Sequence, residues 1–205
     1  MSLTYLYNKL ENMSSREQYT YIQNVFFTYQ IRPKIDIDQI FNDIDGKQSN
    51  GKNPLGYLVM HLTLDQLQQL VPEYLRELVG QSTFNLTDDK IMGIIDDVMQ
   101  GDYEELQINF DTSEMTQVFD FGVAKYSPWS FLKLDRYILI PALFRHLYKF
   151  FYVSQVDEET GISHLAHACC NIRMMQLIDE HKCDENCDNC NKIGCKRFGE
   201  LKRGT

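Results

Sequence analysis

The densest group of side chains able to do chemistry lies between Asp157 and Asn171 of this 205-residue chain. Ser163 can cap the start of a helix in this segment. On that helix His164, His167 and Asn171 lie three and four residues apart, so they share one face and can converge on one ligand. The loop before the helix adds three carboxylates, those of Asp157, Glu158 and Glu159.

This combination of imidazoles, amide and carboxylates is typical of a divalent metal held between acidic side chains and substrate phosphates. A helix start also favours an anion, but a phosphate there would compete with the carboxylates unless a cation bridged them. The alternative is that each histidine packs in the core and bonds to a backbone carbonyl, because His-x-x-His is a short and common pattern.

A second candidate cluster lies at residues 121–129. Here a cation, Lys125, precedes two aromatic side chains, Tyr126 and Trp129, around a proline turn. Such a group can hold a phosphate and stack on a base. A helix end with buried aromatic side chains has the same pattern, so both interpretations stay open.

A third candidate is the pair Arg145-His146, with Lys149 one helical turn later. These groups lie in a strongly apolar segment that is predicted to be a helix. They either face a binding site or extend their charged ends to the protein surface.

In their order and spacing these residues resemble a phage and bacterial family described as dATP/dGTP diphosphohydrolases. The family is related to the all-α, MazG-like nucleotide pyrophosphatases. The resemblance covers about residues 114–177. It is carried by Phe121-Gly122-x-x-Lys125-Tyr126-x-x-Trp129, then Arg145-His146, then Asp157-x-Glu159-Thr160-Gly161-x-x-His164-Leu165-x-His167-Ala168-x-x-Asn171.

The resemblance implies metal-dependent cleavage of dATP or dGTP between the α and β phosphates, with Mg²⁺ or Mn²⁺ as cofactor. Asp157, Glu158 or Glu159 would hold the metal or activate the water. His164 and His167 would be ligands or proton carriers, oriented by Asn171. The implied substrate-binding residues are Lys125, Arg145 and His146 for the phosphates and Tyr126 or Trp129 for the base.

All six cysteines lie within residues 169–195. Cys169 and Cys170 follow the histidines on the predicted helix and are expected to be buried as small apolar residues. The last four can wrap one tetrahedral ion, so we expect either a structural Zn²⁺ site or free thiols there. These four are Cys183, Cys187, Cys190 and Cys195.

Composition limits the class of protein. With 43% hydrophobic residues the chain can bury a sizeable core. No run approaches the roughly 20 apolar residues of a membrane span, and Met1 to Thr4 does not resemble a secretory signal. The net charge of −9 argues against nucleic acid as a partner. We therefore expect a cytoplasmic protein with no membrane partner. The family resemblance implies in addition a phage-encoded protein that binds a nucleoside triphosphate and, by analogy, forms a homo-oligomer.

Apolar residues recur at helical spacing through most of the chain, which predicts an all-α fold with a helical bundle core. In the second half we expect helices at 112–125, 136–152 and 163–181, followed by a short cysteine-rich loop. Residues 44–54 lack apolar anchors and are predicted to form a loop that is a domain boundary or a mobile insert. Alternation at 106–110 is compatible with one minor strand pair.

This pattern suggests three regions. They are a helical N-terminal region at 1–110, a nucleotide-site region at 111–181 and a basic, cysteine-rich tail at 182–205. The metal-binding Glu-x-x-Glu pair of MazG-type enzymes has no recognisable counterpart in the chain. The alternatives to an enzyme are therefore a non-catalytic binding module with the same fold and an interaction protein that acts through a zinc-binding tail.

Overall fold

The computed structural model describes residues 2–75, 86–106, 108 and 111–181. Within these residues the regular structure is helical, and backbone pairing of the β type is limited to two isolated bridges, Ile44–Lys47 and Val156–Ser163. The predicted all-α fold is confirmed. The helices are α1 (Ser2–Glu11), α2 (Ser15–Thr28), α3 (Asp38–Phe41), α4 (Leu55–His61), α5 (Leu64–Gln69), α7 (Leu86–Gln100), α8 (Thr112–Lys125), η1 (Ser130–Lys133), η2 (Arg136–Ile138), α9 (Ile140–Tyr152) and α10 (His164–His181).

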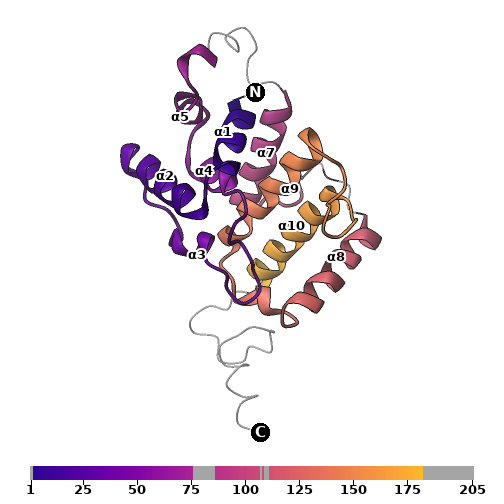
Figure 1. Cartoon of the computed structure of the whole chain (residues 1–205). Coiled ribbons are helices and arrows are strands. Elements are labelled where there is room, and N and C mark those ends of the chain that lie inside the picture. The colour runs from indigo at the N-terminus through magenta and orange to yellow at the C-terminus, as the bar shows by residue number, and fades with distance from the viewer. Residues whose placement is uncertain (1, 76–85, 107, 109–110, 182–205) are drawn as a thin grey trace, which may run out of the picture.

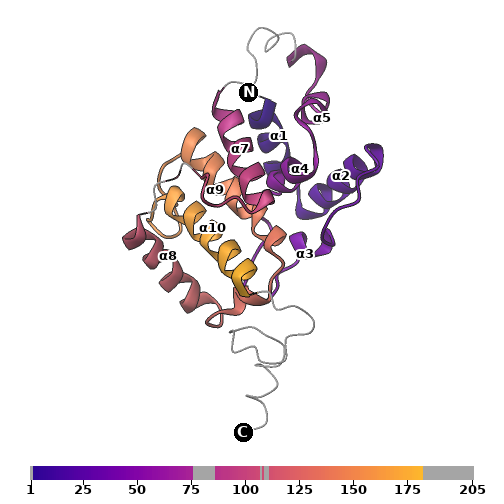
Figure 2. The ribbon, with the colours of Figure 1, turned by 180° about the vertical axis from the view of Figure 1, so that it is seen from behind.

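Helix α9 lies at the centre of the molecule. It packs mainly against α10 on one side and against α4 on the other, with further contact to α7. Helix α8 covers the side of α10 that faces away from α4, as both views of the ribbon show (Figures 1 and 2). The residues of α9 that point toward α10 are therefore enclosed between three helices.

One cluster of buried apolar side chains joins the two halves of the chain. It extends from Leu3 and Leu6 in α1 through Ile94 in α7 to Met175 and Ile178 in α10. A smaller cluster, formed by Val118 of α8 with Ala166 and Cys170 of α10, fixes α8 on the other side. The N-terminal helices thus help to hold α9 in place.

Side-chain caps define several helix starts. Ser14 and Glu17 form a complete capping box at α2, and Thr63 and Gln66 form another at α5. At α10 the hydroxyl of Ser163 accepts a hydrogen bond from the Leu165 backbone N–H at 3.2 Å. This cap fixes the start of the helix that carries the histidines.

The differences from the predicted helices have local causes. The segment 136–152 is a 3-10 turn followed by α9, because Pro141 lies in the first turn of α9, where a missing N–H costs nothing. Helix α5 ends at Gln69, and Pro72 begins a new turn with a Leu75 N–H to Pro72 carbonyl bond of 3.0 Å. Of the expected strand at 106–110, residues 107, 109 and 110 lie outside the described residues, as does the cysteine-rich tail.

Gly56 allows the close approach of α4 and α9. A Cβ added at this position would lie 2.7 Å from both the Phe144 Cβ and the Pro141 Cα. Gly93 in α7 is also helical, but an added Cβ there would have no neighbour within 4 Å.

We therefore expect Gly56→Ala to lower the free energy of unfolding by about 1–3 kcal/mol through overpacking. The same change at Gly93 should raise it by up to about 1 kcal/mol, because alanine favours the helical backbone. Urea unfolding of both variants measures the difference. Equal effects at the two positions would show that the α4–α9 contact is looser than described.

Candidate functional site

A cavity of about 380 Å³ opens where α8, α9 and α10 meet the loop 44–54 and the end of α1. Most of the side chains singled out from the sequence line it. They come from three segments that are distant in the chain, and they are Lys125, Tyr126, Arg145, His146, Lys149, Asp157, Glu158, Glu159, His167 and Asn171.

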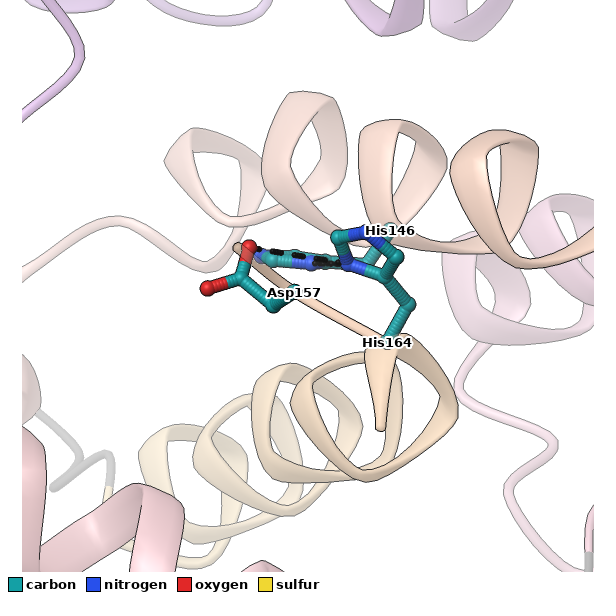
Figure 3. Close-up of side chains that lie close together, drawn as sticks. All are labelled: His146, Asp157 and His164. Carbon is teal, nitrogen blue, oxygen red and sulfur yellow. Dashed lines mark hydrogen bonds and ion pairs between the residues drawn. The ribbon is translucent and has the colours of Figure 1, made fainter. Parts of the chain in front are cut away.

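His146, Asp157 and His164 meet in the space between α9 and α10 (Figure 3). The Nδ1 atoms of His146 and His164 are 2.9 Å apart, and the Nδ1 of His164 is 3.7 Å from Oδ2 of Asp157. The His164 side chain is only 2% exposed and lies behind the cavity wall, whereas His146 and Asp157 line the cavity. These three side chains are called the His–Asp cluster below.

His167 extends this arrangement through Thr160. The Thr160 hydroxyl donates to Oδ1 of Asp157 at 3.1 Å, and its oxygen lies 2.8 Å from Nε2 of His167. Since the hydroxyl proton goes to Asp157, His167 must carry its proton on Nε2 and donate to Thr160. The His167 ring also stacks on the His146 ring, with centroids 4.6 Å apart and an interplanar angle of 8°.

The loop before α10 holds Asp157 in a tight turn. Its Oδ1 accepts the Thr160 backbone N–H at 3.1 Å, and its carbonyl accepts the Gly161 N–H at 2.8 Å. Gly161 has a φ of +71°, a left-handed conformation that glycine adopts without steric cost. The Asp-x-x-Thr-Gly pattern therefore positions the carboxylate before any ligand binds.

Burial sets the ionisation of the site. It lowers the pKa of His164 and of His167, and burial together with the charge of Arg145 holds the pKa of His146 well below its ordinary value. For Asp157, burial raises the pKa, but the Thr160 hydrogen bond and the adjacent imidazoles outweigh that effect and leave it lowered. At neutral pH the cluster thus holds neutral imidazoles beside a carboxylate, the forms in which these groups bind metals.

The His–Asp cluster has the donors of a divalent metal site. One ligand atom from each of the three side chains lies within 4.8 Å of the other two. Two nitrogens and one oxygen suit Mn²⁺ or Zn²⁺ better than Mg²⁺, which prefers oxygen ligands. Metal binding through both Nδ1 atoms would replace the hydrogen bond between His146 and His164, because each nitrogen must offer a lone pair.

Asn171 lines the cavity, but its side chain is bonded to its own helix. Its Nδ2 donates to the His167 backbone carbonyl at 2.7 Å rather than to an imidazole ring. Cys169 and Cys170 are buried in α10, as predicted.

The cavity is rich in cations. Lys125 pairs with Glu159, whereas no carboxylate oxygen in the described part of the chain lies within 4.0 Å of the charged groups of Arg145 and Lys149. Two further lysines, Lys47 and Lys52, come from the loop 44–54. Neither lysine was predicted as a site residue, although each follows a glycine in a loop, a pattern that can place a lysine beside a phosphate.

The two aromatic candidates occupy different places. Tyr126 accepts a hydrogen bond from the Gln48 backbone N–H at 3.0 Å and lines the cavity. Trp129, which is 53% exposed, instead lines a neighbouring cavity of about 370 Å³ with mostly apolar walls. Tyr126, Gly122 and Met174 line both cavities, so Tyr126 lies at the boundary between a polar and an apolar space.

The lowered histidine pKa values predict that the protein loses stability as the pH falls below about 6.5. An unfolded histidine takes up a proton near that pH, whereas the buried imidazoles resist it, so the unfolded state binds more protons. Each such group then lowers the free energy of unfolding by up to about 1.4 kcal/mol per pH unit. We expect His146→Gln to flatten this dependence between about pH 5.5 and 6.5, measured by urea unfolding. If the free energy of unfolding of His146→Gln depends on pH as steeply as that of the wild type, the lowered pKa of His146 is contradicted.

Comparison with known proteins finds a match to a family model that covers part of the site. No curated protein and no solved structure matches the chain. A family model does match, and the matched stretch contains α8, α9 and α10 with the His–Asp cluster but not Lys47 or Lys52. The resemblance indicated by the sequence motifs is thereby confirmed over part of the chain: residues 103–190 match the family model described as dATP/dGTP diphosphohydrolase, N-terminal.

Proposed function

We propose that this protein is a metal-dependent nucleoside triphosphate pyrophosphohydrolase that converts dATP or dGTP to the monophosphate and pyrophosphate. The observation that carries the proposal is the cavity itself, where several cations line the walls beside a carboxylate–histidine cluster. Phosphoryl transfer depends mainly on positioning and charge stabilisation, which such an arrangement can supply. The family match at residues 103–190 supports the choice of substrate.

In this proposal the His–Asp cluster holds the divalent ion. A bound metal would offset the negative charge on the phosphate oxygens during attack by water. Asp157 is suited to this role because its fixed turn and lowered pKa keep it ionised at neutral pH. Thr160 and His167 act as positioning residues, since they hold the Asp157 carboxylate through a shared hydroxyl.

Lys125, Arg145 and Lys149 would bind the phosphates. Arg145 can offer a bidentate fork to phosphate oxygens, and no carboxylate of the described residues occupies it. Among the three loop carboxylates, Asp157 is tied to Thr160 and Glu159 to Lys125. Glu158 lines the cavity without an ion pair in the described chain, so we assign to it the activation of the attacking water.

The apolar cavity beside Tyr126 would receive the base. Met115, Phe119, Trp129 and Leu177 contribute to its walls, which can stack on or pack against a purine ring. Because Tyr126 lines both cavities, a nucleotide could extend past this side chain, with its base in the apolar cavity and its triphosphate in the cationic cavity.

The first test is pyrophosphate release from a panel of deoxynucleoside and ribonucleoside triphosphates, with Mn²⁺, Mg²⁺ or EDTA. We expect metal-dependent release that is fastest with dATP or dGTP and absent with EDTA. Binding of dATP without release from any substrate would contradict hydrolysis and favour the non-catalytic binding module. Far-ultraviolet circular dichroism of the same sample confirms that the protein is folded.

A matched pair of carboxylate variants tests the metal ligands. Asp157→Asn should lower Mn²⁺ affinity and turnover by about 10²-fold or more, because the amide cannot replace the ionised ligand. Asp120→Asn removes an exposed carboxylate of α8 outside the cavity and should change neither quantity. Calorimetric Mn²⁺ titration and pyrophosphate release measure the two effects separately. Wild-type Mn²⁺ affinity in Asp157→Asn would remove this residue from the metal site.

A further inference from the structure

Lys47 and Lys52 enter the cavity from a loop that the family match does not include. Both lysines line the cavity together with Arg145 and Lys149 of α9. No carboxylate of the described residues lies within 4.0 Å of either ammonium group, although a half-buried cation normally has a partner. The two lysines therefore add positive charge to the cavity wall that no carboxylate of the described residues neutralises within 4.0 Å.

The loop 44–54 is held in shape by the Asp43 side chain and by backbone hydrogen bonds across its turn. Oδ1 of Asp43 accepts the N–H groups of Ser49 and Asn50 at 2.9 and 3.0 Å. Ile44 and Lys47 exchange backbone hydrogen bonds of 3.0 and 2.8 Å across the turn. These bonds fix the backbone conformation at Lys47, so the loop forms a wall of the cavity with a defined structure.

The loop is also anchored to the segment after α8. Gly46 has a φ of +92°, and a Cβ added there would lie 3.1 Å from the Phe131 backbone nitrogen. The Gln48 N–H bonds to the Tyr126 hydroxyl, and Lys133 pairs with Asp45 at 3.3 Å. The loop therefore lines the cavity from a defined position.

The positive charges around Lys47 and Lys52 repel one another, and a bound anion would offset this repulsion. Burial and the charges of Arg145 and Lys52 hold the pKa of Lys47 well below its ordinary value, and burial with Arg145 and Lys125 lowers that of Lys52. Cations that repel one another in a shared, half-buried space are stabilised by a polyanion that contacts several of them. A chain of phosphates carries several negative charges and can contact cations of both the loop and α9, so it suits this cavity better than a single phosphate does.

We propose that Lys47 and Lys52 form a clamp for the polyphosphate end of the substrate, the part that leaves as pyrophosphate. The choice of a nucleotide as carrier of that group rests on the proposed function. The polyphosphate site itself does not depend on hydrolysis. The clamp would favour triphosphates over monophosphates and give the N-terminal region a direct part in substrate binding.

The test measures binding of inorganic tripolyphosphate by calorimetry without metal, so that no reaction is involved. We expect Lys47→Met and Lys52→Met each to weaken binding by about tenfold or more, since a charge-assisted hydrogen bond is lost. Lys47→Arg should restore most of the affinity. Lys9→Met, which removes a cation of α1 outside the cavity, should bind within about twofold of the wild type.

Two outcomes would overturn the clamp: wild-type tripolyphosphate binding in both methionine variants, or no binding by the wild type. Thermal unfolding of each variant shows whether it is folded. If Lys47→Met does not fold, Lys52→Met still tests the clamp. Tripolyphosphate binding that needs both lysines, in a protein that hydrolyses no nucleotide, would support the clamp and reject the proposed reaction. Nucleotide hydrolysis with unchanged kcat and KM in both methionine variants would support the proposed reaction and reject the clamp.

Discussion

The packing of α9 against α10 is the contact on which the rest of the site depends. It places His146 against His164 and His167 and directs Arg145 and Lys149 into the cavity. Helix α9 is held from behind by α4, whose Gly56 permits a very close approach. The apolar core therefore fixes the polar site, and a shift of α9 would separate His146 from His164 and Asp157.

The same packing explains how a chain with a net charge of −9 can offer a site for a polyanion. The cavity gathers cations from three separate segments of the chain, while its carboxylates come from Glu11 of α1 and from the loop before α10. Glu11 accepts a hydrogen bond from Asn53, Asp157 is engaged by Thr160, and Glu159 pairs with Lys125. Local placement of charge, rather than net charge, thus determines what the cavity can bind.

Much of the fold and part of the site could be predicted from the sequence. Helical periodicity and capping residues are local signals, so α8 and the cap of α10 by Ser163 were predicted correctly. Pairings between distant segments leave no such signal. The stacking of His146 on His167 and the approach of Lys47 to Arg145 depend on how α9 and the loop 44–54 pack, which spacing along one segment cannot show.

In the proposed function, the His–Asp cluster and the cationic cavity form one site for a metal and a triphosphate. Titration with Mn²⁺, followed by NMR of the histidine ring signals, is the decisive experiment. We expect the signals of His146 and His164 to broaden first, and a non-hydrolysable dATP analogue to tighten Mn²⁺ binding. Equal broadening of His181, which lies at the far end of α10, or no effect of the analogue would contradict it.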